Sequence, residues 1–463
     1  ALVTISAAGG LYFLLTPMAQ YGGGAGTAAS PYLIYTAQQL DSIGARPDDW
    51  DKHFKLMADL DLHAYGPDGF HIIGTLDDGP FTGVFDGNHK RISNLKQVAD
   101  SGSYLGLFGI VDGPDARIEN LTLAAPIIAN EMGRYLGSLV GSLEGGTVSN
   151  CHVRAGNVSG LSFVGGLVGR NDGGSLLNCT AEVTVAGDSR VGGLVGQSYS
   201  GTIEDCRAEG LMQGSEGSYW IGGLIGECRE TTVRRCRTCC TVEGDLNIGG
   251  LLGENLSGTV ESCYAGGVVK GGTYAGGLLG LNSGGTVSDC YSTADVKAVI
   301  YAGGLAGCNE PDCHCIVYVP GTIIRCYACG PVRGVDSGGL VGINDKSQTE
   351  NSFWDKTTGC TKSDGGDGKD ASDMSRLSLY LTAGWDFVDE KANGTEDIWC
   401  LPAEGGYPRF VWELAEGDLN EDGQVDLRDF SELAAQWRQV GETGLVDFDF
   451  LTGFADLWLY GRR

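Results

Sequence analysis

The stretch that decides the fold is Gly165-Gly-Leu-Val-Gly169, because the phrase Gly-Gly-Leu-(Val/Ile/Leu/Ala)-Gly returns along the middle of the chain. It recurs at 192–196, 222–226, 249–253, 276–280, 303–307 and 338–342, and a version with Ser as its second residue stands at 137–141. Successive copies begin 27 to 35 residues apart. Internal periods of this length indicate stacked units, since one such unit cannot bury its apolar face alone. The chain is therefore predicted to be a solenoid.

A cysteine at a constant position shows which kind of solenoid to expect. It follows the first glycine of a unit by 14 residues and ends a Thr-Val-x-x-Cys pattern in its clearest copies; its members are Cys151, Cys179, Cys206, Cys236, Cys263 and Cys290. β-Branched residues alternate with small polar ones here, and the spacing typical of helices is missing. About 27 residues hold three short strands and three turns, so we expect a parallel β-helix whose coils rise about 4.8 Å each. Glycine should supply positive φ at the corners and allow close backbone approach beside Leu.

These units resemble GLUG repeats, a family named after its Gly-Leu-any-Gly core and found in bacterial surface and secreted proteins. The resemblance covers about half of the chain. It implies a β-helical extracellular scaffold and does not imply a reaction. The predicted fold class is all-β: a parallel β-helix with terminal caps, followed by a small α-helical calcium-binding module.

Composition restricts the partners. The formal net charge is −28 and the pI is about 4.4. Nucleic acids and anionic membranes both need a basic surface, so neither is expected as a partner. Cations are the expected small partners.

Five segments are predicted. Residues 1–20 are uncharged and apolar and resemble a signal peptide without its basic start. A lasting N-terminal anchor is the alternative. The apolar run is too short and too interrupted for a stable membrane span. Export to the cell surface or the extracellular space is expected. Residues 21–102 should form an N-terminal cap, with a helix from the capping box at Thr36 to about Ile43. The β-helix should span 103–355, the C-terminal cap 356–413, and the last module 414–463.

The caps are expected because the open ends of a solenoid must be covered. Within 356–413, a short helix is predicted from Ser372 to Tyr380. A group of aromatic residues follows it and is interpreted as part of the cap rather than as a ligand platform: Trp385, Phe387, Trp399, Tyr407, Phe410 and Trp412.

Asp59 and Asp61 lie two residues apart in a predicted strand and so share a face. Paired carboxylates serve in glycoside hydrolysis. The alternative, that they accept hydrogen bonds from turn amides, is favoured because no aromatic or basic groups surround them in the sequence. No catalytic role is assigned.

Cysteines divide into two groups. The repeated set should point inward as buried free thiols, because equivalent positions of stacked coils suit disulfide torsions poorly. Cys308, Cys313, Cys315 and Cys329 surround an insertion, where loop disulfides, a metal site and free thiols all remain open. Cys360 and Cys400 are candidates for a bridge.

A calcium loop is predicted near the C-terminus. Oxygen ligands occupy loop positions 1, 3, 5, 9 and 12, the carbonyl of position 7 is available, and glycine stands at position 6; the metal ligands are Asp418, Asn420, Asp422, Gln424, Asp426 and Asp429. A helix should follow this loop. The arrangement is similar to dockerin modules, which implies a cohesin-like or cell-envelope protein as partner. The second half departs from that pattern, because Gln439, Gly441 and Thr443 stand where ligands are needed. One calcium ion per chain is expected, and cohesin binding is in doubt.

The sequence therefore favours an exported, non-catalytic β-helical scaffold or adhesin attached through a calcium-dependent module. A polysaccharide or another cell-surface ligand would suit its face. The alternative is a polysaccharide-active enzyme, a lyase or glycoside hydrolase tethered by its dockerin. Such an enzyme should carry a local cluster of carboxylates with Arg or Lys on one face, and no such cluster is evident in the sequence.

Overall fold

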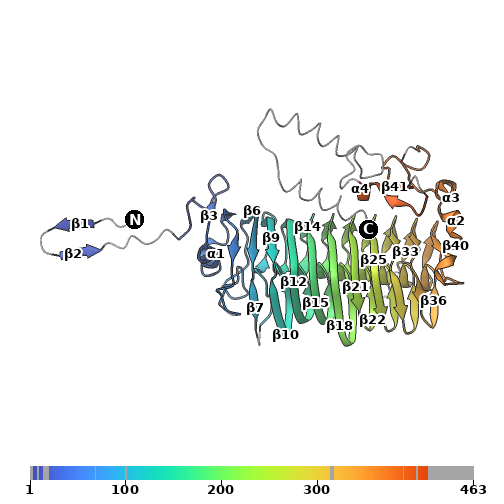
Figure 1. The fold of residues 1–463 in the computed structure, drawn as a ribbon, viewed down its shortest axis with the longest axis horizontal. Coiled ribbons are helices and arrows are strands. Elements are labelled where there is room, and N and C mark those ends of the chain that lie inside the picture. Colours follow the sequence, from blue (N-terminus) through green and yellow to red (C-terminus); the bar gives the residue numbers. More distant parts are fainter. Residues whose placement is uncertain are drawn as a thin grey trace.

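The computed structural model describes residues 4–7, 10–13, 20–67, 69–99, 102–312, 318–388, 390–402 and 405–414. The chain forms an all-β parallel solenoid of about 11 turns with few helices. Figure 1 shows it as one long rod, with helix α1 (Ala37–Gly44) at its N-terminal end and helices α2 (Ala371–Met374) and α3 (Leu377–Thr382) at the other. The predicted β-helix is confirmed. Residues 415–463 lie outside the described residues.

One side of the rod is a nine-stranded parallel sheet whose strands begin at the fourth residue of each glycine phrase and continue beyond it. Its strands are β8 (Phe108–Val111), β11 (Val140–Leu143), β13 (Val168–Asp172), β16 (Val195–Tyr199), β19 (Ile225–Arg229), β23 (Leu252–Leu256), β27 (Leu279–Ser283), β32 (Ala306–Glu310) and β37 (Val341–Asn344). Each pairs with the strand one coil away, without a register shift.

The other two sides belong to one continuous set of parallel pairs. The Thr-Val strands are β14 (Ser175–Leu177), β17 (Thr202–Glu204), β20 (Thr232–Arg234), β24 (Thr259–Glu261), β28 (Thr286–Ser288), β33 (Thr322–Ile324) and β38 (Gln348–Glu350). After the cysteine corner come β15 (Thr180–Gly192), β18 (Arg207–Gly222), β21 (Arg237–Glu243), β22 (Leu246–Gly249), β25 (Tyr264–Gly271), β26 (Tyr274–Gly276), β29 (Tyr291–Ser292), β30 (Asp295–Ala298), β31 (Tyr301–Gly303), β34 (Tyr327–Ala328), β35 (Val332–Arg333), β36 (Asp336–Gly338) and β39 (Phe353–Asp355). In the earliest coils, β9 (Arg117–Ala124), β10 (Ile127–Gly137) and β12 (Thr147–Gly165) run through these corners.

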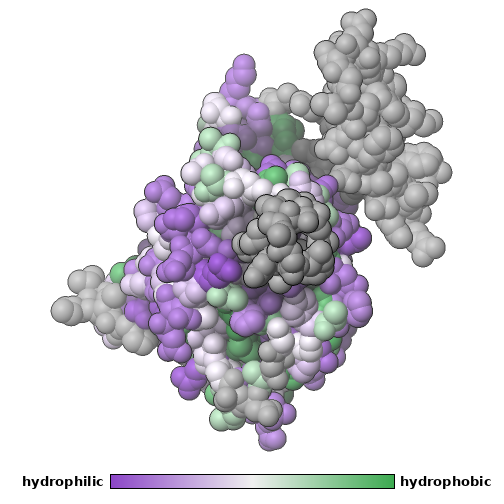
Figure 2. Space-filling model, turned by 90° about the vertical axis from the view of Figure 1, so that its left-hand side faces the viewer, coloured by the Kyte–Doolittle hydropathy of each residue, from purple (hydrophilic) through white to green (hydrophobic). Residues whose placement is uncertain are grey.

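The N-terminal part of the chain contains mostly short elements. They are the antiparallel pair β1 (Thr4–Ala7) and β2 (Gly10–Phe13), then β3 (Tyr32–Ile34), α1 (Ala37–Gly44), η1 (Pro47–Asp49), β4 (His53–Leu56), β5 (Leu60–Asp61), β6 (Val84–Ser93) and β7 (Lys96–Val98). Thr36 caps α1 by accepting a hydrogen bond from the Gln39 amide at 3.2 Å, which confirms the predicted helix start, while the Gln39 side chain accepts from the Tyr35 amide at 2.7 Å instead of from the Thr36 amide. Leu40 and Ile43 are buried and close this end of the core. Figure 2 looks onto this end and shows mostly hydrophilic residues among those that are coloured.

The C-terminal elements are η2 (Lys356–Thr358), β40 (Asp367–Lys369), α2 (Ala371–Met374), α3 (Leu377–Thr382), β41 (Trp399–Cys400), β42 (Arg409–Phe410) and α4 (Val411–Leu414). The single helix predicted from Ser372 to Tyr380 was wrong: α2 and α3 are separate, and Arg376 between them has extended backbone. Figure 1 shows α4 and β41 along the side of the rod, over the coils that contain β25 and β33. A segment expected to cover the end thus also covers a flank.

Glycine plays only one of its two predicted roles in the repeated phrase. A Cβ on Gly222 would lie 2.0 Å from the Ile225 carbonyl oxygen, and one on Gly223 would lie 1.9 Å from that of Gly250, so close backbone approach excludes any side chain. The corner before each ladder cysteine does have positive φ, but non-glycine residues supply it, including Asn178 (φ 51), Asp205 (φ 55) and Arg235 (φ 49). The prediction that glycine supplies positive φ was therefore wrong at these corners, but it is confirmed in the turns before the Thr-Val strands at Gly146, Gly173 and Gly284, whose φ is 82°, 85° and 65°.

Candidate functional site

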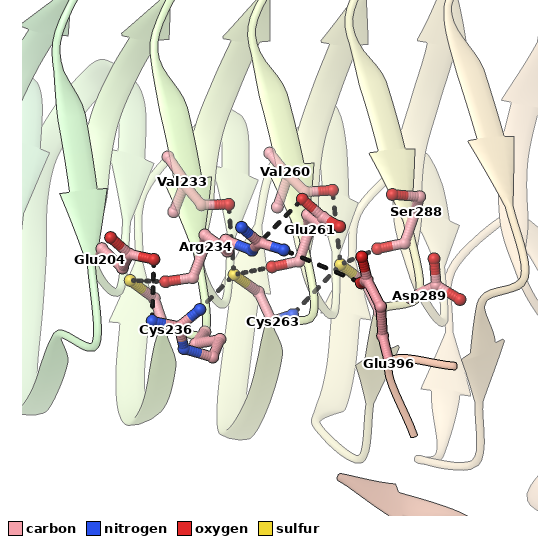
Figure 3. Close-up of polar contacts among 12 residues, drawn as sticks. Glu204, Val233, Arg234, Cys236, Val260, Glu261, Cys263, Ser288, Asp289 and Glu396 are labelled. Atoms are coloured by element: carbon pink, nitrogen blue, oxygen red, sulfur yellow. Dashed lines mark hydrogen bonds and ion pairs between the residues drawn. The ribbon is translucent and has the colours of Figure 1, made fainter. Parts of the chain in front are cut away.

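The repeated cysteines form one inward ladder. Adjacent coils pair so that Cys151 stands opposite Leu121, and the Cys326 amide donates to the Ser352 hydroxyl at 3.0 Å. Each thiol donates to nearby carbonyls, as Cys263 does to Val233 and Glu261 at 3.6 and 3.1 Å. Figure 3 shows these sulfur contacts in successive coils. The ladder cysteines are buried and free, so they pack as small apolar groups.

The other predicted cysteine and carboxylate features separate in the structure. Cys360 is a free buried thiol whose sulfur lies 3.9 Å from the Val332 carbonyl oxygen, so the predicted bridge to Cys400 was wrong. Cys308 and Cys329 are free, while Cys313 and Cys315 lie outside the described residues. In the part of the chain that the structure describes, no group of three or more His, Cys, Asp or Glu side chains is placed to hold a metal ion.

Asp59 and Asp61 serve the turns. Asp59 accepts hydrogen bonds from the Arg91 backbone amide at 2.9 Å and from its guanidinium at 3.3 Å. Asp61 accepts from the His63 amide at 2.9 Å and the Asn94 side chain at 2.8 Å. These contacts bear out the interpretation that the two carboxylates accept hydrogen bonds from backbone amides, while Arg91 is a basic neighbour of Asp59 that the sequence did not indicate.

The predicted calcium ligands Asp418, Asn420, Asp422, Gln424, Asp426 and Asp429 all lie outside the described residues. The calcium loop stays a prediction.

One edge of the rod carries a stack of large side chains that sequence reasoning missed. Tyr104, Tyr135 and Phe163 stack at 4.7 Å between ring centroids, coil on coil. The Arg190 guanidinium continues the stack, lying 4.8 Å from the Phe163 ring and 4.3 Å from the Trp220 ring. The signal was available in the sequence, since these residues stand two before the first glycine of their phrases.

A charged cluster lies beside this stack. Arg190 forms an ion pair with Glu227, which also accepts a hydrogen bond from Gln197 at 2.8 Å. Glu254 stands opposite Glu227 in the next coil, and one of its buried carboxylate oxygens, Oε2, has no hydrogen-bond partner among the described residues. Burial raises the pKa of Glu254 to about 7, and the Glu227 charge adds to the rise. The expectation of no carboxylate–arginine cluster was therefore wrong, because parallel stacking brings together residues about 30 apart in sequence.

A second stack, on another face, meets the C-terminal segment. Tyr264, Tyr291 and Tyr327 stack at 4.9 Å with interplanar angles of 8° and 2°. The aromatic residues predicted for the cap pack against these tyrosines and form a second apolar core outside the coils, whose buried members include Trp385, Phe387, Trp399 and Phe410.

Hydrogen bonds fix the C-terminal segment in place. The Tyr291 hydroxyl donates to Glu413 at 2.8 Å, and the Tyr327 hydroxyl donates to the Pro408 carbonyl at 2.6 Å. Burial raises the pKa of Glu413 to about 7. Between the segment and the coils lies a cavity of about 420 Å³.

The GLUG motif matches residues 162–186, 187–210 and 271–297. The chain contains GLUG repeats. A protein named "Putative Gly-rich membrane protein" from Evansella cellulosilytica is 36% identical over 142 residues, which are 29% of this chain and 16% of that protein. Halomucin from Haloquadratum walsbyi is 32% identical over 145 residues, which are 30% of this chain and 2% of that protein.

The GLUG-repeat chain thus matches only a small part of the length of either relative. Among solved structures, that of a "putative immunoglobulin A1 protease" from Bacteroides ovatus is similar at 19% identity and a TM-score of 0.37, over 85% of this chain and 96% of the other. Within the described residues, none of the helices has the length and apolar character needed to cross a membrane.

Proposed function

We propose that this GLUG-repeat chain is an exported, non-catalytic scaffold or adhesin that presents the side of its rod to an extracellular glycan. The observation that carries this proposal is the matching of outward side chains between coils. Arg235 forms a double ion pair with Asp205 at 2.8 Å, and Arg325 pairs with Asp289 in the same column. Such ladders stiffen a one-dimensional fold, in which each coil touches only its neighbours.

Attachment is assigned to residues 414–463, as a calcium-dependent dockerin-like module that binds a cohesin-like or cell-envelope protein. Four aspartates within twelve residues repel one another until a cation binds, so calcium should order the loop. The net charge of −28 supports cationic small partners and gives no basic surface for nucleic acid.

The test is recovery of the full chain with cell-envelope material from the source organism, with calcium or with a chelator. The wild-type chain should co-sediment with envelope protein in calcium and lose that fraction in chelator. Asp418→Ala should behave in calcium as the wild type does in chelator, while glycan binding by the rod stays unchanged. Equal recovery under both conditions removes the attachment module from the proposal.

The polysaccharide-active enzyme remains the second candidate, and the Glu227–Glu254 pair favours it. Arg190 forms an ion pair with Glu227, whereas burial raises the pKa of Glu254 to about 7, and two neighbouring carboxyl groups in such different surroundings suit a base and an acid. A panel of polysaccharides should then yield reducing ends or unsaturated products. Glu254→Gln and Glu227→Gln should each abolish this yield, with Glu243→Gln on another strand as the matched control. No product from the wild-type chain excludes this candidate for the tested polysaccharides.

A further inference from the structure

The cavity beneath the C-terminal segment has protein walls on two opposite sides. Its wall is the stack of Tyr264, Tyr291 and Tyr327, and its opposite side is formed by the segment that contains Tyr407 and Arg409. Gly405 and Gly406, with φ of 85° and 128°, bend that segment in a conformation that L side chains rarely adopt. Its volume of about 420 Å³ lies within the range of small-molecule sites.

Several polar groups in this cavity are left unmatched by the protein. Among the described residues, no hydrogen-bond partner is found for the Tyr264 hydroxyl or the Thr293 hydroxyl, which both line the cavity. The Arg409 guanidinium also lines it, and its charge opposes the rise in the pKa of Glu413 that burial causes, although the described residues show no ion pair between the two. The Glu413 carboxylate accepts from Tyr291 and lines the same space. The cavity therefore offers two hydroxyl groups that can each donate and accept a hydrogen bond, one guanidinium that only donates, and one carboxylate that accepts.

This mixture selects a class of ligand. An apolar ligand would leave these groups unpaired, which costs free energy. A metal ion would meet the Arg409 guanidinium beside a single carboxylate, which is a poor oxygen cage. A sugar ring carries hydroxyls that both donate and accept, and its C–H surface can pack against aromatic side chains.

We propose that the cavity that the tyrosine stack forms with Pro402, residues 405–409 and Glu413 binds one saccharide unit of the extracellular glycan. Tyr264, Thr293 and Glu413 hold sugar hydroxyls, and Arg409 accommodates a carboxylate when the sugar is a uronic acid. This inference rests on the proposed function and names the site at which the glycan binds.

The experiment uses the full chain with two probes, a neutral methyl hexoside and a hexuronic acid methyl glycoside. Titration is followed by calorimetry and by tryptophan fluorescence, because Trp412 stacks against Tyr264 at 6.1 Å. Both probes should bind at one site per chain. Tyr264→Phe and Thr293→Val each remove one hydroxyl and should weaken both probes about tenfold. Arg409→Ala should weaken the uronic acid more than the hexoside.

Matched controls separate the site from general effects. Tyr301→Phe alters a tyrosine stacked on Tyr274 at 5.4 Å, and Thr259→Val alters an exposed threonine on another face, so neither should change binding. The assignment is overturned if the controls weaken binding as much as the site variants do. It is also overturned if the site variants bind like the wild type.

The two proposals fail in different ways. If envelope glycan binds the chain but neither probe does, or binding ignores Tyr264 and Thr293, only the site is wrong. If neither probes nor envelope glycan bind, the glycan-binding function falls with it.

Discussion

The side-chain amide of Asn282 donates a hydrogen bond to the amide oxygen of Asn309, one coil away, at 2.8 Å. The same contact joins Asn255 to Asn282 and Asn309 to Asn344, so a column of amides runs inside one corner of the rod. The column has a break. Cys228 stands where the next amide is expected, and the Asn255 Oδ1 atom is buried without a hydrogen-bond partner among the described residues.

Restoring this column should require two changes. Thr231 occupies the position that is Gly258 one coil on, where a Cβ would lie 2.5 Å from the Asn255 side-chain oxygen. Cys228→Asn alone should therefore lower the free energy of unfolding, because the larger side chain meets Thr231. Together with Thr231→Gly it should supply the missing donor.

The measurement is a double-mutant cycle by chemical denaturation. We expect a favourable coupling of about 1 kcal/mol or more between the two changes. A coupling near zero would contradict the column as a set of interacting amides.

The ladder thiols should be protected by the fold. Cys179, Cys206, Cys263 and Cys290 are buried, so alkylation under native conditions should leave them unmodified and should label them after denaturation. Cys239 is exposed and serves as the internal control, which should react first. Mass mapping that finds ladder cysteines bonded to one another would show that the sulfur contacts of Figure 3 are misassigned.

Glu254 should make stability depend on pH. Its pKa rises from 4.5 to about 7 on folding, so the folded chain binds more protons than the unfolded chain between these values. Stability should therefore fall as pH increases from about 4.5 to about 7, by up to about 3 kcal/mol from this group.

Glu254→Gln tests this dependence, because glutamine is close in shape and does not ionise. The variant should show a smaller decrease in the midpoint of urea denaturation between pH 5 and pH 8. Glu243→Gln is the control, since Glu243 lies on β21 and pairs with Lys270 at 2.6 Å instead. An unchanged slope in Glu254→Gln would place the titrating group elsewhere.

Calcium binding should be saturable, with one ion per chain. Asp418→Ala removes the first loop ligand and should abolish it, whereas Thr443→Ala in the second half, which lacks the carboxylates, should not. Calorimetry on the full chain distinguishes these outcomes. Binding that survives Asp418→Ala would rule out the predicted loop.

Much of the rod could be predicted because one coil repeats. The 14-residue offset between glycine and cysteine placed Cys263 beside Cys290 correctly. A repeated local pattern is enough to predict the fold when each coil packs on a copy of itself.

The charged cluster and the cavity could not be predicted in the same way. Arg190 meets Glu227 across 37 residues, and Tyr291 meets Glu413 across 122, so neither contact has a local signature. The first needed a column-by-column alignment of outward residues. The second depends on how a nonrepetitive segment folds back, which no periodicity encodes. The prediction of glycine at the corner before each ladder cysteine failed for another reason. Asn, Asp and Arg tolerate a φ near 50° when neighbouring coils impose it.

The course of the C-terminal segment also determines how the rod would bear tension. A tether attached beyond Leu414 would pull first on the contact between Glu413 and Tyr291, at the flank, rather than on the last coil. The coils from Tyr327 to Phe353 lie between that contact and the point where the chain leaves the solenoid. They would therefore bear tension only after the aromatic segment had lost its contacts with the coils. The first event under force would therefore be the opening of the flank, with the stacked coils still intact.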